Sequence, residues 1–452
     1  MDNVGISVIM PSLNVGEYIE ECLCSVLSQS YQDIEVLVID AGSTDGTKEI
    51  ILKYAQLDSR IKLIHSVKKS YGYQMNLGIE SAKGRYIAIV ETDDILAERI
   101  YEKLLLIAEE TDADFVKGFP ELFWGNYQEA VWTSNTLSFF DGIDQRIHGN
   151  QIVIWPKDMP ELLQRDLFLW TGIYKRKFIQ KIRFNETQGA AFQDQGVLLK
   201  ILSQAAKGVY INSLSYKYRQ TNPNSSIVNP KGLMYLVNEY KANEDYVKQL
   251  SPAWQKAFYR RLWIQCIERF RCMARERKFW HSELCYMKEL KEMLALQWEQ
   301  GIIQEAYCEK YEVNTYRLFC QKPEMLYQEY VHYYQKYIEL LQQLDRFLWK
   351  KTIIIFGCGN IGKFLHLICE LRMPGQVEAY CDNSHKRIGT KVQGLTVYSP
   401  KQAVKIFKEC IFAIAGKRYE AEMRRQLDSL GIPDTRIYVY TGGIELELLK
   451  IK

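Results

Sequence analysis

Tyr86-Ile-Ala-Ile-Val-Glu-Thr-Asp-Asp-Ile95 is the stretch from which the fold of this chain can be inferred. Its first five residues are apolar strand formers, and they are followed at once by three carboxylates, Glu91, Asp93 and Asp94. Mutual repulsion and desolvation both oppose such a cluster at the end of a buried strand. A divalent cation would relieve both costs, because hard cations bind carboxylate oxygens. The alternative is a strand that ends in a solvated acidic turn.

On the N-terminal side of this stretch, apolar runs of strand length alternate with segments of helical periodicity. The expected strands are 6–11, 34–39, 61–65 and 86–90, and the expected helices are 16–30, 47–54 and 72–82. Such alternation indicates a mainly parallel, doubly wound α/β sheet. Ligands of these sheets bind beyond the carboxyl ends of the strands. Pro11, Asp40 and residues 91–94 should therefore line one crevice.

The composition is that of a globular protein with room for about three domains in its 452 residues. A net charge of +3 gives no indication of a nucleic-acid partner. The eleven cysteines include no Cys-x-x-Cys pair, which is typical of reduced thiols in a cytosolic protein. The sequence shows neither a membrane-spanning run nor a signal peptide. We expect a cytoplasmic protein, with contact at the inner face of the cell membrane as an open alternative.

Four segments follow one another in the first 94 residues. They are Val8-Ile-Met-Pro-Ser-Leu-Asn14, Val38-Ile-Asp-Ala-Gly-Ser-Thr-Asp-Gly46, the segment 72–84 with Asn76 and Gly78, and Glu91-Thr-Asp-Asp94. Together they resemble the nucleotide-binding half of family 2 glycosyltransferases, which have the GT-A fold. Two positions depart from the family pattern, because Ala41 stands where a second acidic residue is frequent and Glu91 stands where Asp is usual. Since a carboxylate is kept at 91, we expect an active enzyme.

The resemblance extends into the following residues. The segments are Trp170-Thr-Gly-Ile-Tyr-Lys-Arg176, Phe184-Asn-Glu-Thr-Gln-Gly189, Phe192-Gln-Asp-Gln195 and Tyr218-Arg-Gln-Thr-Asn-Pro-Asn-Ser-Ser226. They are similar to the acceptor half of bacterial polysaccharide-building members. In that family the Asp of the Gln-Asp pair, here Asp194, opens a helix and serves as the catalytic base, and Glu186 is the next candidate. The alternative for Asp194 is a carboxylate that only favours a helix N-terminus.

The resemblance implies an inverting transfer of a sugar from a nucleotide diphosphate sugar, UDP-linked, to a hydroxyl. The acceptor would be a glycan or a lipid-linked sugar in cell-surface polysaccharide synthesis, as in a capsule. Mg²⁺ or Mn²⁺ held by Asp93, with Glu91 and Asp94 nearby, would stabilise the diphosphate leaving group. The implied donor-binding residues are Pro11, Asn14, Asp40, Asn76, Thr92, Asp93 and Arg219.

Two of these donor-binding roles have ordinary structural alternatives. Asp40 would accept a hydrogen bond from the base, or else would bond to its own turn. Arg219 would meet a donor phosphate or an acceptor charge, or else would form a surface ion pair.

Residues 231–348 carry long helical stretches that are rich in Tyr, Trp and basic residues. The favoured interpretation is a helical extension whose aromatic side chains form a core. The alternative is an amphipathic surface that touches a membrane carrying a lipid-linked acceptor.

Residues 349–452 contain a second α/β pattern. The segment Gly357-Cys-Gly-Asn-Ile-Gly362 follows an expected strand and opens a helix, and Asp382 ends the next strand about 20 residues later. This is the dinucleotide-binding fingerprint in its strand context, and it resembles Rossmann-like domains of sugar-modifying enzymes. A nucleotide or dinucleotide would bind at Gly357, Gly359, Gly362 and Asp382. The alternative is a unit kept for packing or for a homo-oligomer.

We therefore expect three domains, a GT-A domain at 1–230, a helical extension at 231–348 and a Rossmann-like domain at 349–452. The principal alternative function is a catalytically silent scaffold or nucleotide-sugar sensor. A third possibility is that the C-terminal unit is itself an enzyme such as an oxidoreductase. A sugar nucleotidyltransferase is excluded because Pro11-Ser-Leu-Asn-Val-Gly16 lacks the glycine- and arginine-rich loop of that class.

Overall fold

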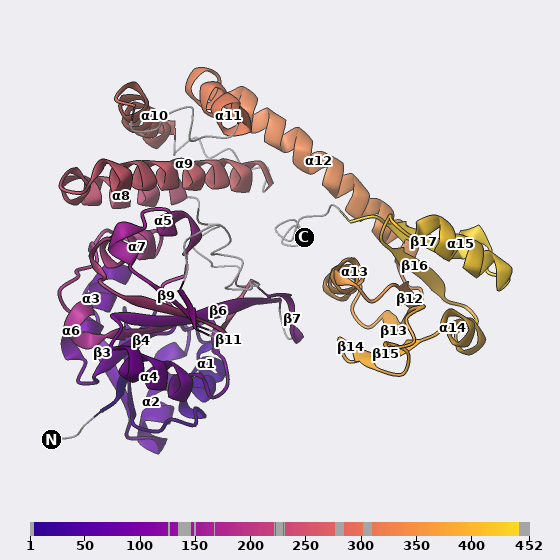
Figure 1. Ribbon diagram of the computed structural model, residues 1–452, viewed down its shortest axis with the longest axis horizontal. Coiled ribbons are helices and arrows are strands. Elements are labelled where there is room, and N and C mark those ends of the chain that lie inside the picture. The colour runs from indigo at the N-terminus through magenta and orange to yellow at the C-terminus, as the bar shows by residue number, and fades with distance from the viewer. Residues whose placement is uncertain are drawn as a thin grey trace. The chain divides into compact units, whose positions relative to one another are not determined.

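The computed structural model describes residues 4–124, 127–133, 146–148, 151–166, 168–220, 222, 229, 231–275, 284–301 and 310–442. They separate into two compact units (Figure 1). The first holds the residues before 328, apart from short segments at 126–131 and 274–277 that group with the second. The second holds the residues from 328 onward. The predicted boundaries at 230 and 348 stay predictions.

The first unit is built on a mixed sheet with helices packed around it (Figure 1). The strands of this sheet are β1 (Ile6–Ser12), β2 (Ile34–Asp40), β3 (Ile61–His65), β4 (Tyr86–Ile89), β5 (Ile95–Leu96), β6 (Phe115–Trp124), β7 (Tyr127–Thr133), β8 (Arg146–His148), β9 (Gln151–Ile154), β10 (Gly172–Lys175) and β11 (Gly208–Arg219). Its first helices are α1 (Ile19–Leu27), α2 (Thr47–Leu57), α3 (Tyr71–Ser81), α4 (Ile100–Thr111), α5 (Leu162–Arg165), α6 (Arg176–Ile179) and α7 (Gln193–Gln204).

The N-terminal half of this sheet has the predicted alternation of strands and helices. Its strands run in the order β3-β2-β1-β4 and are all parallel. β1, β2 and β4 are buried along their whole length, which accounts for their nearly continuous apolar sequence. The sheet continues as β10-β6-β11-β9-β8, and the pairs of β4 with β10 and of β10 with β6 are antiparallel. The sequence did not predict this second half.

The carboxyl ends of the parallel strands meet at one edge, as the sequence predicts. Gln74 of α3 is buried, and its side-chain amide donates to the backbone carbonyls of Ser12 at 3.0 Å and Ile39 at 2.6 Å. The Thr92 hydroxyl donates to the backbone carbonyl of Pro11 at 2.9 Å. These bonds join the ends of β1 and β2 to each other and to the acidic stretch after β4.

In the part of the chain that the structure describes, five further helices follow the mixed sheet. They are α8 (Gly232–Lys248), α9 (Pro252–Arg275), α10 (Leu284–Glu299), α11 (Lys310–Gln321) and α12 (Pro323–Leu348). Their aromatic side chains pack together. The Trp263 ring lies 5.3 Å from that of Tyr316 and 5.6 Å from that of Phe319, and the rings of Tyr240 and Phe258 lie 4.5 Å apart. The predicted aromatic core of this region is confirmed for these residues.

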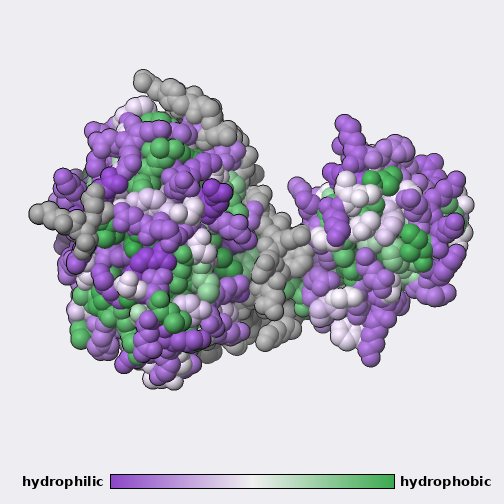
Figure 2. Space-filling view, turned by 90° about the horizontal axis from the view of Figure 1, so that it is seen from below, coloured by the Kyte–Doolittle hydropathy of each residue, from purple (hydrophilic) through white to green (hydrophobic). Residues whose placement is uncertain are grey.

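None of the described helices is both long and apolar enough to cross a bilayer. Figure 2 shows hydrophilic and hydrophobic residues interspersed on the face that it presents of each unit. Contact with a membrane surface stays a prediction.

The second unit contains the C-terminal sheet. Its elements are β12 (Ile353–Phe356), α13 (Asn360–Arg372), β13 (Val377–Cys381), β14 (Lys391–Val392), β15 (Leu395–Tyr398), α14 (Pro400–Ile406), β16 (Ile411–Ala415), α15 (Glu420–Ser429) and β17 (Ile437–Tyr440). The strands β15-β13-β12-β16-β17 are parallel and lie in that order. This is the order of the doubly wound sheets that bind dinucleotides.

Candidate functional site

The acidic stretch lies where β4 ends, and its first carboxylate is held by tyrosines. The Tyr71 hydroxyl donates to Glu91 Oε1 at 2.7 Å, and the Glu91 backbone N–H donates to the Tyr216 hydroxyl at 2.9 Å. Burial raises the pKa of the Glu91 carboxyl to about 8, and the charges of Asp93 and Asp194 add to the rise, although the bond from Tyr71 opposes it. Glu91 therefore lies in a site that disfavours its negative charge.

Asp93 and Asp94 have different surroundings. Asp93 Oδ2 accepts a hydrogen bond from the Asn222 side chain at 2.7 Å. Asp94 Oδ1 accepts from the Arg219 backbone N–H at 2.7 Å, whereas its Oδ2 is buried and meets no donor with hydrogen-bond geometry among the described residues, although the nearby Tyr216 hydroxyl lowers the pKa of this carboxyl. Burial and the charge of Asp93 hold the pKa of Asp94 well above its usual range. An unpaired carboxylate oxygen in this position is a candidate cation ligand.

Arg219, at the end of β11, fixes the acidic stretch in place. Its Nε donates to the backbone carbonyl of Asp93 at 2.6 Å, and its Nη2 donates to Glu21 at 2.6 Å. The guanidinium also lies over the rings of Tyr18 and Phe123, 4.9 and 4.6 Å from their centroids. Arg219 thus forms an ion pair in which its own guanidinium is buried and the Glu21 carboxylate is exposed, so the pair lies at the protein surface, as the alternative interpretation of the sequence allowed. Its contact with a donor phosphate stays a prediction.

The loop after β2 lies against the loop after β1. The Asp40 carboxylate accepts from the backbone N–H groups of Gly42 at 3.0 Å and Ser43 at 3.1 Å, so it stabilises its own turn. The Asn14 side chain accepts from the Thr44 backbone N–H at 2.9 Å, which connects the two loops. Asp40 and Asn14 therefore shape this edge of the crevice, and their contacts with a donor stay predictions.

Asn76 has structural partners in the acceptor half. Its amide both donates to and accepts from the backbone of Phe184, at 3.0 Å each, and it also donates to Glu186 at 3.2 Å. These bonds give no support to a donor-binding role for Asn76. Glu186 also pairs with Lys68 at 2.7 Å and Arg183 at 2.8 Å, and these partners lower the pKa of its carboxyl. A carboxylate held in this way is a poor general base, so Asp194 remains the better candidate.

Asp194 lies in the first turn of α7, as the sequence predicts. The residue before this helix, Phe192, adopts a left-handed backbone conformation with φ 70°. Asp194 Oδ2 accepts from the Gln195 side chain at 2.8 Å, while burial raises the pKa of Asp194. Its charge also raises the pKa values of Glu91 and Tyr71. The fold therefore brings Asp194 within electrostatic reach of the acidic stretch, from which it is separated by about a hundred residues.

Two residues that the sequence analysis missed also organise this site, Tyr71 and Gln74. Both follow Ser70, whose hydroxyl accepts from the Tyr73 backbone N–H at 3.3 Å and marks the start of α3. The start of that helix is the only sequence signal, because the partners of Gln74 are backbone carbonyls, which no side-chain pattern reveals.

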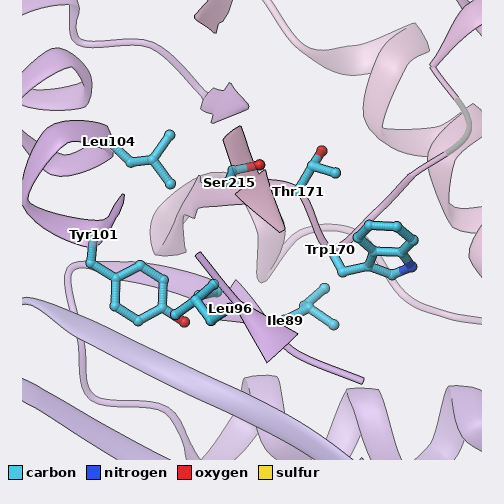
Figure 3. Close-up of a pocket in the computed structure, with 9 residues that line it drawn as sticks. Ile89, Leu96, Tyr101, Leu104, Trp170, Thr171 and Ser215 are labelled. Atoms are coloured by element: carbon cyan, nitrogen blue, oxygen red, sulfur yellow. The ribbon is translucent and has the colours of Figure 1, made fainter. Parts of the chain in front are cut away.

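A small, mostly apolar cavity is lined by residues on or beside β4, α4, β10 and β11 (Figure 3). Its lining residues are Ala88, Ile89, Leu96, Tyr101, Leu104, Trp170, Thr171, Gly172 and Ser215. None of the predicted site residues lines it, so it belongs to the core and not to the site.

In the second unit, the glycine loop leads from β12 into α13. A Cβ on Gly362 would lie 1.9 Å from the backbone oxygen of Gly357, whereas a Cβ on Gly359 would have no atom within 4 Å. Gly357 has φ +112°, which favours glycine. The Asp382 carboxylate accepts from the Cys358 backbone N–H at 3.0 Å and so holds the loop itself. Of the three glycines, Gly359 is therefore the one beside open space.

Comparison with known proteins decides the family. Residues 7–170 match the glycosyl transferase family 2 model, and residues 349–438 match a family described as C2185-like, N-terminal. Glycosyltransferase GlyG of Streptococcus pneumoniae serotype 4 is 32% identical over 225 residues, which are 48% of this chain and 70% of GlyG.

The chain belongs to glycosyltransferase family 2. A second relative of this glycosyltransferase, the uncharacterized glycosyltransferase EpsJ of Bacillus subtilis, is 28% identical over 227 residues, 49% of this chain and 62% of EpsJ. TuaG of Bacillus subtilis, whose name assigns it to teichuronic acid biosynthesis, is 30% identical over 184 residues, 38% of this chain and 73% of TuaG. The crystal structure of Staphylococcus aureus TarS residues 1–349 has a TM-score of 0.50 at 16% identity, over 74% of this chain and 91% of that one. This last likeness supports the GT-A fold.

Proposed function

We propose that this glycosyltransferase moves a sugar from a nucleotide diphosphate sugar, UDP-linked, to an acceptor hydroxyl with inversion at the anomeric carbon. The observation that carries the proposal is the approach of Asp194, in the first turn of α7, to the acidic stretch at the end of β4. Asp194 can then act on the acceptor hydroxyl, while the carboxylates of the acidic stretch act at the donor diphosphate. A single displacement with one base inverts the configuration.

The carboxylates of the acidic stretch fit a divalent cation such as Mg²⁺ or Mn²⁺. Asp94 Oδ2 meets no donor with hydrogen-bond geometry among the described residues, and the pKa of Glu91 is raised by burial, so added positive charge would stabilise both. The described residues contain no group of three or more His, Cys, Asp or Glu gathered closely enough to hold a metal. Mg²⁺ is usually bound through one or two carboxylates together with substrate phosphates. When bound, the ion would stabilise charge on the leaving diphosphate.

Within this scheme, the chain's own residues bind the donor and move one proton. Asp194 accepts the proton of the acceptor hydroxyl as its oxygen attacks. Asp93 is the carboxylate of the motif that we assign to the ion, with Glu91 and Asp94 in support. Arg219 keeps this motif in place through the Asp93 carbonyl.

The remaining donor contacts come from the crevice edge. We assign them to Pro11, Asn14, Asp40 and Thr92, which lie on the loops that meet there. A glycan or lipid-linked acceptor in cell-surface polysaccharide synthesis is supported by relatives such as TuaG. Cytoplasmic donor use, at the inner face of the membrane where such acceptors are carried, is part of the same proposal.

The test is release of nucleotide diphosphate from a panel of UDP- and GDP-sugars in Mn²⁺ or Mg²⁺. We expect one UDP-sugar to be turned over, with activity lost in chelator. Asp93→Ala should lose turnover while its melting temperature stays unchanged. The matched control is Asp33→Ala, at an exposed position on the loop before β2, and it should keep turnover. Full activity in chelator would refute the metal assignment, and no turnover of any donor would favour the silent scaffold.

A further inference from the structure

A chain of hydrogen bonds connects α9 of the helical extension to Asp194. Arg261 donates through Nε and Nη2 to a single atom, Gln195 Oε1, at 3.1 and 2.8 Å. Gln195 Nε2 in turn donates to Asp194 Oδ2 at 2.8 Å. Arg261 is only 9% exposed, so this connection is shielded from water.

The donor and acceptor groups of the three side chains fix the direction of each hydrogen bond in this series. A guanidinium has five N–H donors and no acceptor, so only the oxygen of the Gln195 amide can face Arg261. The NH₂ group must then face Asp194, and Asp194 Oδ2 must accept. An NH₂ group cannot accept the O–H of a protonated carboxyl, and its own hydrogen bond is stronger to a carboxylate than to a neutral carboxyl. The arrangement therefore favours the ionised form of Asp194, which a base requires, against the effect of burial.

The bond between Asp194 and Gln195 also needs outside support. Adjacent residues of a helix project in different directions and do not normally face one another. Two N–H groups of Arg261 on one oxygen hold the Gln195 amide in the orientation that reaches back to Asp194. Without Arg261, this side chain would gain rotational freedom at the start of α7.

The neighbouring charges also bear on whether Asp194 is ionised. Burial raises the pKa of Asp194, whereas the bond from Gln195 and the positive charge of Arg261 lower it. The charges of Asp194 and Glu91 oppose each other, and the other titratable groups that feel Asp194 are the phenols of Tyr71, Tyr218 and Tyr240. Among the described residues, Arg261 supplies a positive charge that lowers the pKa of Asp194.

We propose that Arg261 is a positioning residue for glycosyl transfer, which acts through Gln195 to keep Asp194 ionised and oriented. The inference rests on the proposed role of Asp194 as the base. Arg261 lies on α9, so this role falls to the helical extension, beyond the residues 7–170 that match the family model. α9 thereby takes part in the reaction without touching the donor.

The test compares Arg261→Met, Gln195→Met and the double variant in the full chain. UDP release from the most active UDP-sugar, with water as acceptor in Mn²⁺, gives kcat and KM, and titration with UDP gives donor affinity. Arg271→Met is the matched control, since Arg271 lies on the same helix in a partly exposed ion pair with Glu268. Gln195→Met leaves Arg261 in place, so it tests the link even where Arg261→Met fails to fold.

Each single variant should lower kcat by about 10- to 100-fold, the loss expected for hydrogen bonds to a charged group. KM and UDP affinity should stay near the wild-type values, and the control should be unaffected. The double variant should resemble the worse single variant, because both changes break the same series of hydrogen bonds. The inference would be overturned if the kcat losses of the two single variants multiplied in the double variant, or if kcat were unchanged. It would also be overturned if UDP affinity fell as much as kcat.

Asp194→Asn separates this inference from the function beneath it. If Asp194→Asn retains turnover, the proposed base is wrong, and the role of Arg261 falls with it. If Asp194→Asn loses turnover while Arg261→Met and Gln195→Met keep it, only the inference about Arg261 fails.

Discussion

Glu239 of α8 offers a test of how burial acts in the acceptor half. It is 1% exposed, and it accepts hydrogen bonds from Asn185 at 2.7 Å, Asn243 at 2.9 Å and Thr187 at 3.1 Å. Burial raises the pKa of Glu239 from its ordinary value near 4.5 to about 7, although these bonds oppose the rise. Glu239 thus connects the loop before α7 to the helical extension, in surroundings that destabilise its ionised form.

The sign of the effect on stability follows from the raised pKa. The stabilisation that Glu239 provides is complete below about pH 4.5 and is lost as the pH rises through about 7. The difference corresponds to about 3 kcal/mol in the free energy of unfolding. Glu239→Gln stays neutral and keeps the bonding pattern, since its oxygen can face Asn185 and Asn243 and its NH₂ group can face Thr187. It should stabilise the first unit by up to about 3 kcal/mol at pH 8 and by about 1 kcal/mol or less at pH 5.

Urea denaturation followed by tryptophan fluorescence measures this difference, because eight of the nine tryptophans precede residue 328. The variant and the wild type should be compared at pH 5, 6.5 and 8. Glu244→Gln, which removes a carboxylate from a partly exposed position on the same helix, is the matched control. A difference between wild type and Glu239→Gln that does not change with pH would refute the reasoning, as would a variant that is less stable at pH 8.

The remaining predictions concern the second unit and the modular organisation. Gly359→Val should fold normally, because its side chain enters open space, and should abolish any binding of nucleotides by the second unit in calorimetric titration. Gly362→Val should instead lower the melting temperature, because its Cβ would collide with the Gly357 oxygen. A chain that ends at Tyr327 should keep metal-dependent UDP release, since every residue assigned to the reaction precedes it; loss of release from a folded shortened chain would contradict this.

The sequence was sufficient for the parallel half of the first sheet. β1, β2 and β4 are apolar runs bounded by turn residues, so local pattern and burial agree. β10 pairs with both β4 and β6 across long separations in the chain. No local pattern records such pairings, because they depend on the whole sheet.

Part of the candidate site could likewise be inferred from local sequence motifs, and part could not. The sequence identifies Asp194 and the acidic stretch as candidates, since each sits in a recognisable motif, and their roles stay predictions. No motif reveals the hydrogen bonds of Asn76 to the backbone of Phe184 and to Glu186, and its contact with a donor stays a prediction. The link from Arg261 to Asp194 was hidden for a related reason, since it passes through a neutral amide 66 residues away in the chain.

The central claim is that Asp194 is the base of a glycosyl transfer whose donor is held elsewhere, and Asp194→Asn tests it most directly. The change keeps the size of the side chain and removes its basicity. UDP release from the active UDP-sugar should fall by about 10²–10⁴-fold, the usual contribution of general base catalysis, while UDP affinity in Mn²⁺ stays within about twofold of the wild type. Unchanged release, or a loss of UDP affinity equal to the loss of release, would contradict the claim.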